Sequence, residues 1–282
     1  MIILLLLVLA VPICSIPTAL IVWLLHRHEQ AADGKLIRDF VVFLVLFVTA
    51  FWQITKSHGV RMRLDPDYRI QVEIESNPVY LSLKGLESEA KTFHDKLVNS
   101  MRAGKSIQLA LLLARPWLRD EVTNYSGFAD QKTRLRWASL YVATLKELQN
   151  IDSSSCYQEI GQHDLDESIL VRGFSFENSQ VFQQTVVDVH ESALRGMSHE
   201  YPKDERPADF NATALENSAI NKDIEERFGT EIVDIIRRHR FSDSEPGAPE
   251  KICAARIFQL ESMLKRPQAT ASLLVDSALR YK

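Results

Sequence analysis

Imidazole and carboxylate side chains gather at Asp188, His190 and Glu191, followed by His199 and Glu200. Both groups are common metal ligands, and a helical site needs them three or four residues apart so that they face one ion. Asp188 and His190 are two residues apart and therefore point in different directions on a helix. A glycine also separates the two histidines. We therefore expect no metal site here, but a solvated helix end followed by a loop.

A second group of reactive types is Cys156, His163 and Asp164, which could suggest a thiol nucleophile with a general base. A reactive cysteine needs an electropositive setting that stabilises the thiolate, and the surrounding sequence DSSSCYQE supplies none. We expect Cys156 to be a buried structural residue rather than a catalytic one.

The chain has three cysteines, which is too few for a disulfide framework. Cys14 lies within an apolar run, which leaves Cys156 and Cys253 as the pair that could form a bridge in an oxidising compartment. Two reduced, buried thiols are the alternative, and composition favours them.

Residues 237–240, RRHR, form the one basic run. Such a run could contact anionic lipid headgroups or an acidic partner. Because cations in the last turn of a helix complement its dipole, we expect helix capping instead. Glycine-rich phosphate loops and the GxSxG serine motif are absent from the sequence, which predicts no cofactor and gives no support to serine hydrolase chemistry.

The chain that carries these groups begins with two apolar segments. Residues 2–25 carry no charge and would span about 36 Å as a helix, enough to cross a bilayer of about 30 Å. The second segment, 37–54, is shorter and needs flanking cations to reach both interfaces. We expect a transmembrane hairpin over residues 1–56. The side chains predicted to lie at the membrane interface are Trp23, Arg38, Trp52 and Lys56.

A cleaved signal peptide is the alternative for the first segment. No cation precedes the apolar run, and the run is longer than the usual apolar core of about 7–15 residues, so we expect an anchor. Flanking cations number three in the loop and four after the second span. The positive-inside rule thus favours a cytoplasmic domain by one charge. The membrane that we expect is a bacterial inner membrane.

Residues 57–77 are expected to be a juxtamembrane connector, extended over residues 68–74 because apolar and polar residues alternate there. Residues 78–282 are expected to form an extramembrane all-α domain of about eight helices. Capping residues and helix breakers predict boundaries at Gly104, Ser106, Pro116 and Asp130, and a tight corner at Gly229.

After residue 64 the chain keeps 27 of its 33 basic residues and 34 of its 37 acidic ones, a formal charge of −7. An acidic domain repels phosphate backbones, so we expect no nucleic-acid partner. The bilayer and a protein partner or second copy are the expected partners. The sequence is typical of a membrane-anchored interaction or assembly protein; a membrane-tethered hydrolase and an accessory subunit of a sensor or transport complex are the alternatives.

Overall fold

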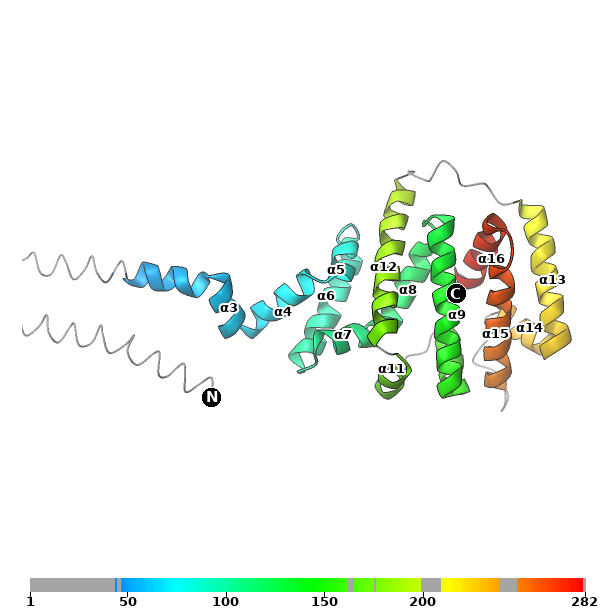
Figure 1. Cartoon of the computed structure of the whole chain (residues 1–282), viewed down its shortest axis with the longest axis horizontal. Helices are drawn as coiled ribbons and strands as arrows, with labels where there is room; N and C mark the ends of the chain where they lie inside the picture. The colour runs from blue at the N-terminus through cyan, green and yellow to red at the C-terminus, as the bar shows by residue number, and fades with distance from the viewer. Residues whose placement is uncertain are drawn as a thin grey trace, which may run out of the picture. The chain divides into compact units, whose positions relative to one another are not determined.

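The computed structural model describes residue 44 and residues 47–161, 165–174, 176–198, 209–238 and 248–280, and all regular structure within them is helical. This confirms the all-α prediction for the described part of the chain. The named helices are α3 (His58–Leu64), α4 (Pro66–Glu75), α5 (Pro78–Leu83), α6 (Glu87–Arg102), α7 (Ile107–Leu113), α8 (Arg115–Ser126), α9 (Gln131–Ile151), α10 (Ser153–Ile160), α11 (Glu167–Gly173), α12 (Phe176–Met197), α13 (Phe210–Phe228), α14 (Thr230–Arg238), α15 (Ala248–Leu264) and α16 (Gln268–Arg280) (Figure 1).

Contacts divide the chain into two units, Met1–Arg69 and Ile70–Lys282, with the division inside α4. In the first unit residues 47–56 are helical, and the large apolar side chains of residues 48–54 are exposed, Trp52 by 59% and Ile54 by 58%. Downstream, the Arg61 guanidinium lies 3.9 Å from the centre of the Tyr68 ring, so cation–π contact links α3 to the first turn of α4.

No helix among the described residues is long and apolar enough to span a membrane. The predicted first span, 2–25, lies wholly outside the described residues, and of the second, 37–54, only residue 44 and residues 47–54 are described.

The extended conformation expected over residues 68–74 is wrong, because these residues belong to helix α4. The Asp65 carboxylate accepts a hydrogen bond of 3.0 Å from the Tyr68 backbone N–H, and proline occupies the first helical position. Ile70 and Ile74 are buried. Residues four apart share a helix face as well as a strand face, so the alternation did not distinguish the two structures.

Helix boundaries predicted from capping residues are confirmed in α6 to α9. Gly104 ends the turn after α6 with φ +85°, a conformation that favours glycine. Ser106 and Asp130 cap α7 and α9 by accepting hydrogen bonds from backbone N–H groups three residues on, at 3.3 and 2.8 Å. The chain divides at Ala114, so that Pro116 occupies the first turn of α8.

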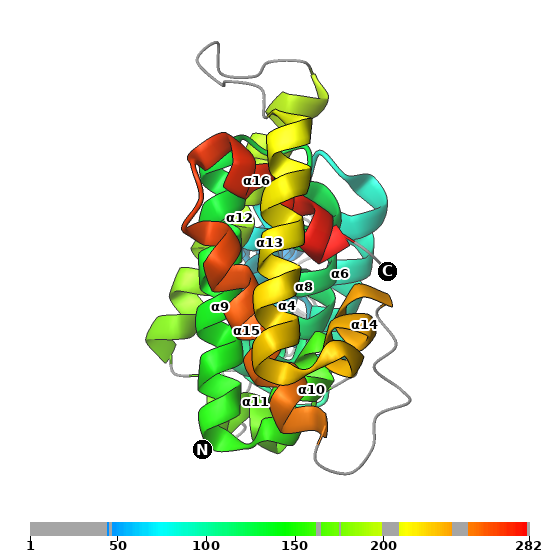
Figure 2. The same cartoon turned by 90° about the vertical axis from the view of Figure 1, so that its right-hand side faces the viewer.

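Helix α9 lies at the centre of the larger unit, with α12 on one side and α15 and α16 on the other (Figures 1 and 2). Its side chains Trp137, Leu145 and Leu148 are at most 1% exposed, which is why the helix must be covered on several sides. Phe128, in the turn between α8 and α9, is by contrast 40% exposed.

The last four helices in the sequence, α13 to α16, pack against one another in the larger unit (Figure 2). Gly229 separates α13 from α14 with φ +99° and ψ 155°, a backbone conformation that is essentially restricted to glycine. The predicted corner at Gly229 is therefore confirmed, and it turns α14 back toward α15. From Pro78 onward the described residues contain twelve helices rather than about eight, because short helices such as α10 and α11 were not predicted.

Candidate functional site

The three described residues of the Asp188, His190 and Glu191 group all lie on α12 and face different surroundings. Asp188 pairs with Arg136 of α9, and His190 faces Ser82 of α5. Glu191 is exposed, and His199 and Glu200 lie outside the described residues. Within the described residues no three His, Cys, Asp or Glu side chains gather closely enough to hold a metal ion.

His190 is fully buried in the core, where its Nδ1 lies 3.2 Å from the Ser82 hydroxyl oxygen and its Nε2 has no hydrogen-bond partner. The Tyr125 ring meets it edge-on at 6.0 Å, and the Tyr125 hydroxyl donates to Glu89 at 2.8 Å. Burial lowers the pKa of His190 to about 4, although the Glu89 charge opposes this effect. The imidazole is therefore neutral and structural at ordinary pH.

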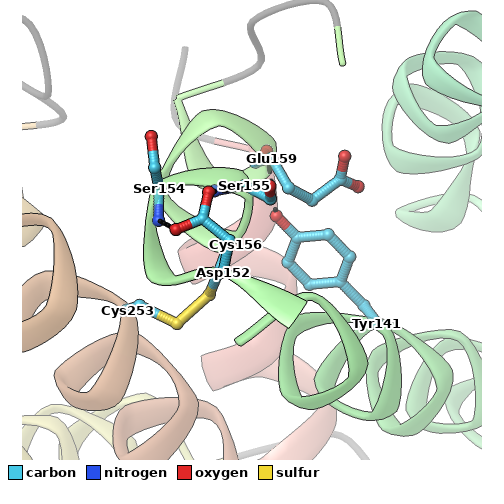
Figure 3. The surroundings of a disulfide bond; sticks show 7 residues. All are labelled: Tyr141, Asp152, Ser154, Ser155, Cys156, Glu159 and Cys253. Carbon is cyan, nitrogen blue, oxygen red and sulfur yellow. Dashed lines mark hydrogen bonds between the residues drawn. A yellow bond between two sulfur atoms is a disulfide. The ribbon is translucent and has the colours of Figure 1, made fainter. Parts of the chain in front are cut away.

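Cys156 of α10 and Cys253 of α15 form a disulfide between two helices that are 97 residues apart in sequence (Figure 3). The expectation of two reduced thiols is therefore wrong. Both cysteines are fully buried, and the helix pair brings their Cα atoms to 5.9 Å, within the range that a disulfide requires. With its sulfur bonded, Cys156 cannot act as a thiolate nucleophile; His163 and Asp164 lie outside the described residues.

One turn beyond Cys156, Glu159 forms a buried ion pair with Arg119 of α8 at 2.7 Å. Arg119 also bonds Asp120, and these carboxylates raise its pKa although burial opposes them. Figure 3 shows Glu159 and Tyr141 beside the disulfide. Because Arg119 and Glu159 are buried and paired with each other, this ion pair serves packing.

The predicted interface anchors are described only in part. Trp52 and Lys56 lie one helical turn apart, with the Lys56 ammonium 4.4 Å from the centre of the Trp52 ring. Trp23 and Arg38 lie outside the described residues.

An open polar cavity lies between α13, α14, α15 and α16, with a volume of about 330 Å³. Hydrogen-bonding groups come from all four helices, and four apolar side chains share the walls. The polar lining residues are Asn217, Asn221, Arg237, Arg256, Gln259 and Ser277, and the apolar ones are Ile236, Met263, Leu274 and Ala278. The lining thus contains two guanidinium groups and no carboxylate.

Arg256 is the buried charge of this cavity, with 5% of its surface exposed. It donates one hydrogen bond of 2.6 Å to the Gln259 side chain and another of 2.6 Å to the Ala278 carbonyl, while its buried Nε has no partner. Burial lowers the pKa of Arg256. Among the described residues no carboxylate pairs with it, so the positive charge is not neutralised from within the described fold.

Arg237 belongs to the basic run that was predicted to cap a helix. It lies in the last turn of α14, is exposed, and lines the cavity, so its position suits ligand binding as well as the helix dipole. The Arg238 side chain and residues 239–240 are not described. Arg256 was not singled out from the sequence, although it is the one charged residue within the largely apolar stretch ICAARIFQL.

The arrangement defines an all-helical unit with a cation-lined cavity, formed where four helices near the end of the chain meet. Comparisons of the chain with protein-family models, with curated proteins and with solved structures find no match.

Proposed function

We propose that this protein is a membrane-anchored interaction or assembly protein, and that the cavity between α13 and α16 is its binding site. The observation that carries the proposal is the chemistry of the cavity lining: guanidinium, amide and hydroxyl groups with apolar side chains. Such groups bind and orient a ligand, but the lining has no group that would exchange a proton near neutral pH. A binding role fits this lining better than a catalytic one.

The proposed anchor is the helical hairpin over residues 1–56. It is supported by the uncharged run 2–25 and by the exposed apolar side chains of residues 48–54. A lysine stacked on a tryptophan at the end of this helix is the type of pair that lies at a membrane interface.

We further propose that the helical domain faces an oxidising compartment. Disulfides persist in the periplasm, the secretory lumen and the extracellular space, and cytosolic thiols are kept reduced. The flanking cations favour the cytoplasm by a single charge, which is weaker support than the pairing of Cys156 with Cys253.

A cysteine placed at Lys222, which is exposed on α13, tests this orientation when the native cysteines are replaced by alanine. A membrane-impermeant maleimide should label the Lys222→Cys variant in intact spheroplasts. Labelling only after lysis would place the domain in the cytoplasm.

Particle mass tests the assembly role. The full chain, extracted in discs of native lipid, should be recovered in particles heavier than one 32.2 kDa chain with its lipid. Recovery of the wild type as a single chain at every concentration would contradict the assembly role.

The alternative of a membrane-tethered hydrolase requires open nucleophile and base groups. Among the described candidates, His190 is sealed in the core and the Cys156 sulfur is bonded, so the cavity has neither. The other alternative, an accessory subunit of a membrane complex, is a special case of the proposed assembly role. In that case the protein partner is itself a membrane protein.

A further inference from the structure

We infer that the cavity between α13 and α16 binds a small organic oxyanion, a carboxylate or phosphate joined to an apolar body. The inference rests on the proposed function, because it takes this cavity to be the binding site and names the chemical class of its ligand.

The charge of the cavity lining is the first reason. Arg256 and Arg237 give two formal positive charges, and no lining residue is acidic. The molecule as a whole carries a formal charge of −4, so this local excess is not a general feature of its composition. Oxyanions are the ligands that match the planar guanidinium group, because its N–H donors meet two oxygens at once.

The state of Arg256 is the second reason. A buried cation is stable in a protein when a counter-ion or a full set of hydrogen bonds replaces its water. Arg256 has neither among the described residues: Gln259 and the Ala278 carbonyl each accept one bond, and the buried Nε has no acceptor. A ligand oxygen would supply both the missing charge and the missing acceptor.

The surrounding polar groups suit the same ligand. Asn217 and Asn221 lie four residues apart on α13 and therefore face the cavity together, and Ser277 lies on α16 opposite them. No side-chain hydrogen bond from these three residues appears within the described fold, so their donors are available to further ligand oxygens.

The apolar wall and the volume argue against a bare inorganic ion. Ile236, Met263 and Leu274 line the cavity beside the arginines, and about 330 Å³ is at the lower end of the range of small-molecule sites. An acid with a short carbon chain would use both parts of the lining.

Two sources offer this chemistry, a free organic acid and an anionic lipid headgroup, and the experiment separates them. Full-length protein is placed in discs of phosphatidylcholine and titrated with butyl phosphate, hexanoate or inorganic phosphate at constant ionic strength, with thermal unfolding as the readout. A parallel set of discs contains phosphatidylglycerol without added acid. A saturable rise of the unfolding temperature with butyl phosphate or hexanoate supports a free acid; a rise with phosphatidylglycerol alone supports a lipid headgroup.

Arg237→Ala is the main variant, because this side chain is exposed and its loss leaves the fold intact. Removing one charge-assisted hydrogen bond should weaken binding about tenfold or more. Lys251→Ala removes an exposed cation from α15 outside the cavity and should bind as the wild type does. Arg256→Lys keeps the buried charge but loses the planar fork, and should also bind more weakly.

Equal stabilisation of the wild type and Arg237→Ala by every anion would overturn the inference, as would no response to any acid or to phosphatidylglycerol. These outcomes differ from failure of the proposed function, which is measured by the particle mass of the native-lipid discs. An intact partner complex without an anion response overturns the ligand class alone.

Discussion

The buried imidazole of His190 makes the stability of the helical domain depend on pH. Its pKa is lowered to about 4 by burial in the core, with Glu89 as the charge that opposes the shift and Tyr125 as the ring packed against it. In the unfolded chain the same imidazole has a pKa of about 6.5. Acid therefore protonates the unfolded state first, and stability should fall as the pH falls from about 6.5 toward 4.

The size of the effect follows from the two pKa values. A difference of about 2.5 units corresponds to a loss of about 3.4 kcal/mol once the pH is below both values. At pH 5 the loss relative to pH 8 should be about 2 kcal/mol. Above pH 7 the imidazole is neutral in both states and should contribute no pH dependence.

His190→Asn is the variant that tests this reasoning. The asparagine amide can replace Nδ1 opposite Ser82, and it does not titrate. Urea unfolding of the full chain, followed by tryptophan fluorescence in neutral detergent at pH 8 and pH 5, measures the free energy of unfolding. The variant starts from a lower stability because a cavity replaces part of the ring, but it should lose about 2 kcal/mol less than the wild type between the two pH values. His94→Asn is the control, because its side chain is 31% exposed, and it should follow the wild type. Parallel losses in the wild type and His190→Asn would refute the assignment.

Three further changes test other parts of the fold by the same unfolding measurement. Reduction of the Cys156–Cys253 bridge, which closes a loop of about 97 residues, should lower the free energy of unfolding by up to about 4.7 kcal/mol; an unchanged urea midpoint in a reductant would show that the bridge does not form. Gly229→Ala should destabilise by about 1–3 kcal/mol because φ is +99°, whereas a stability equal to the wild type would mean that the corner has another conformation. Arg119→Met leaves Glu159 buried without its partner and should cost about 3–5 kcal/mol, and a loss below about 1 kcal/mol would show that the pair is solvated.

Local chemistry explains which parts of the fold could be predicted from the sequence. Ser106 and Asp130 cap helices through hydrogen bonds to backbone groups three residues away, so the sequence window contains both partners. Asp152 ends α9 and also caps α10, by accepting hydrogen bonds from the Ser154 and Ser155 N–H groups. A capping residue thus separates two helices without a loop.

Contacts between distant residues explain most of the rest. The pairing of Cys156 with Cys253 depends on α10 packing against α15, and no local pattern specifies which helices pack together. His190 shows the same limit from the other side. Its spacing from Asp188 predicts that the two side chains point in different directions, but only the packing of α5 and α8 on α12 shows that the ring is sealed.

The cavity combines these two cases. Its exposed cation could be seen in the sequence, because Arg237 lies in a basic run for which helix capping was preferred over contact with a lipid or an acidic partner. The buried cation Arg256 lies 19 positions further on in an apolar stretch, where burial predicts an ion pair with a carboxylate. The two arginines share one cavity because Gly229 turns α14 back onto α15, and the described fold gives neither of them an acidic partner. A charge that the fold buries without neutralising is costly to keep unless something outside the fold completes it, and for this reason the cavity, rather than His190 or Cys156, is the feature to which a function is assigned.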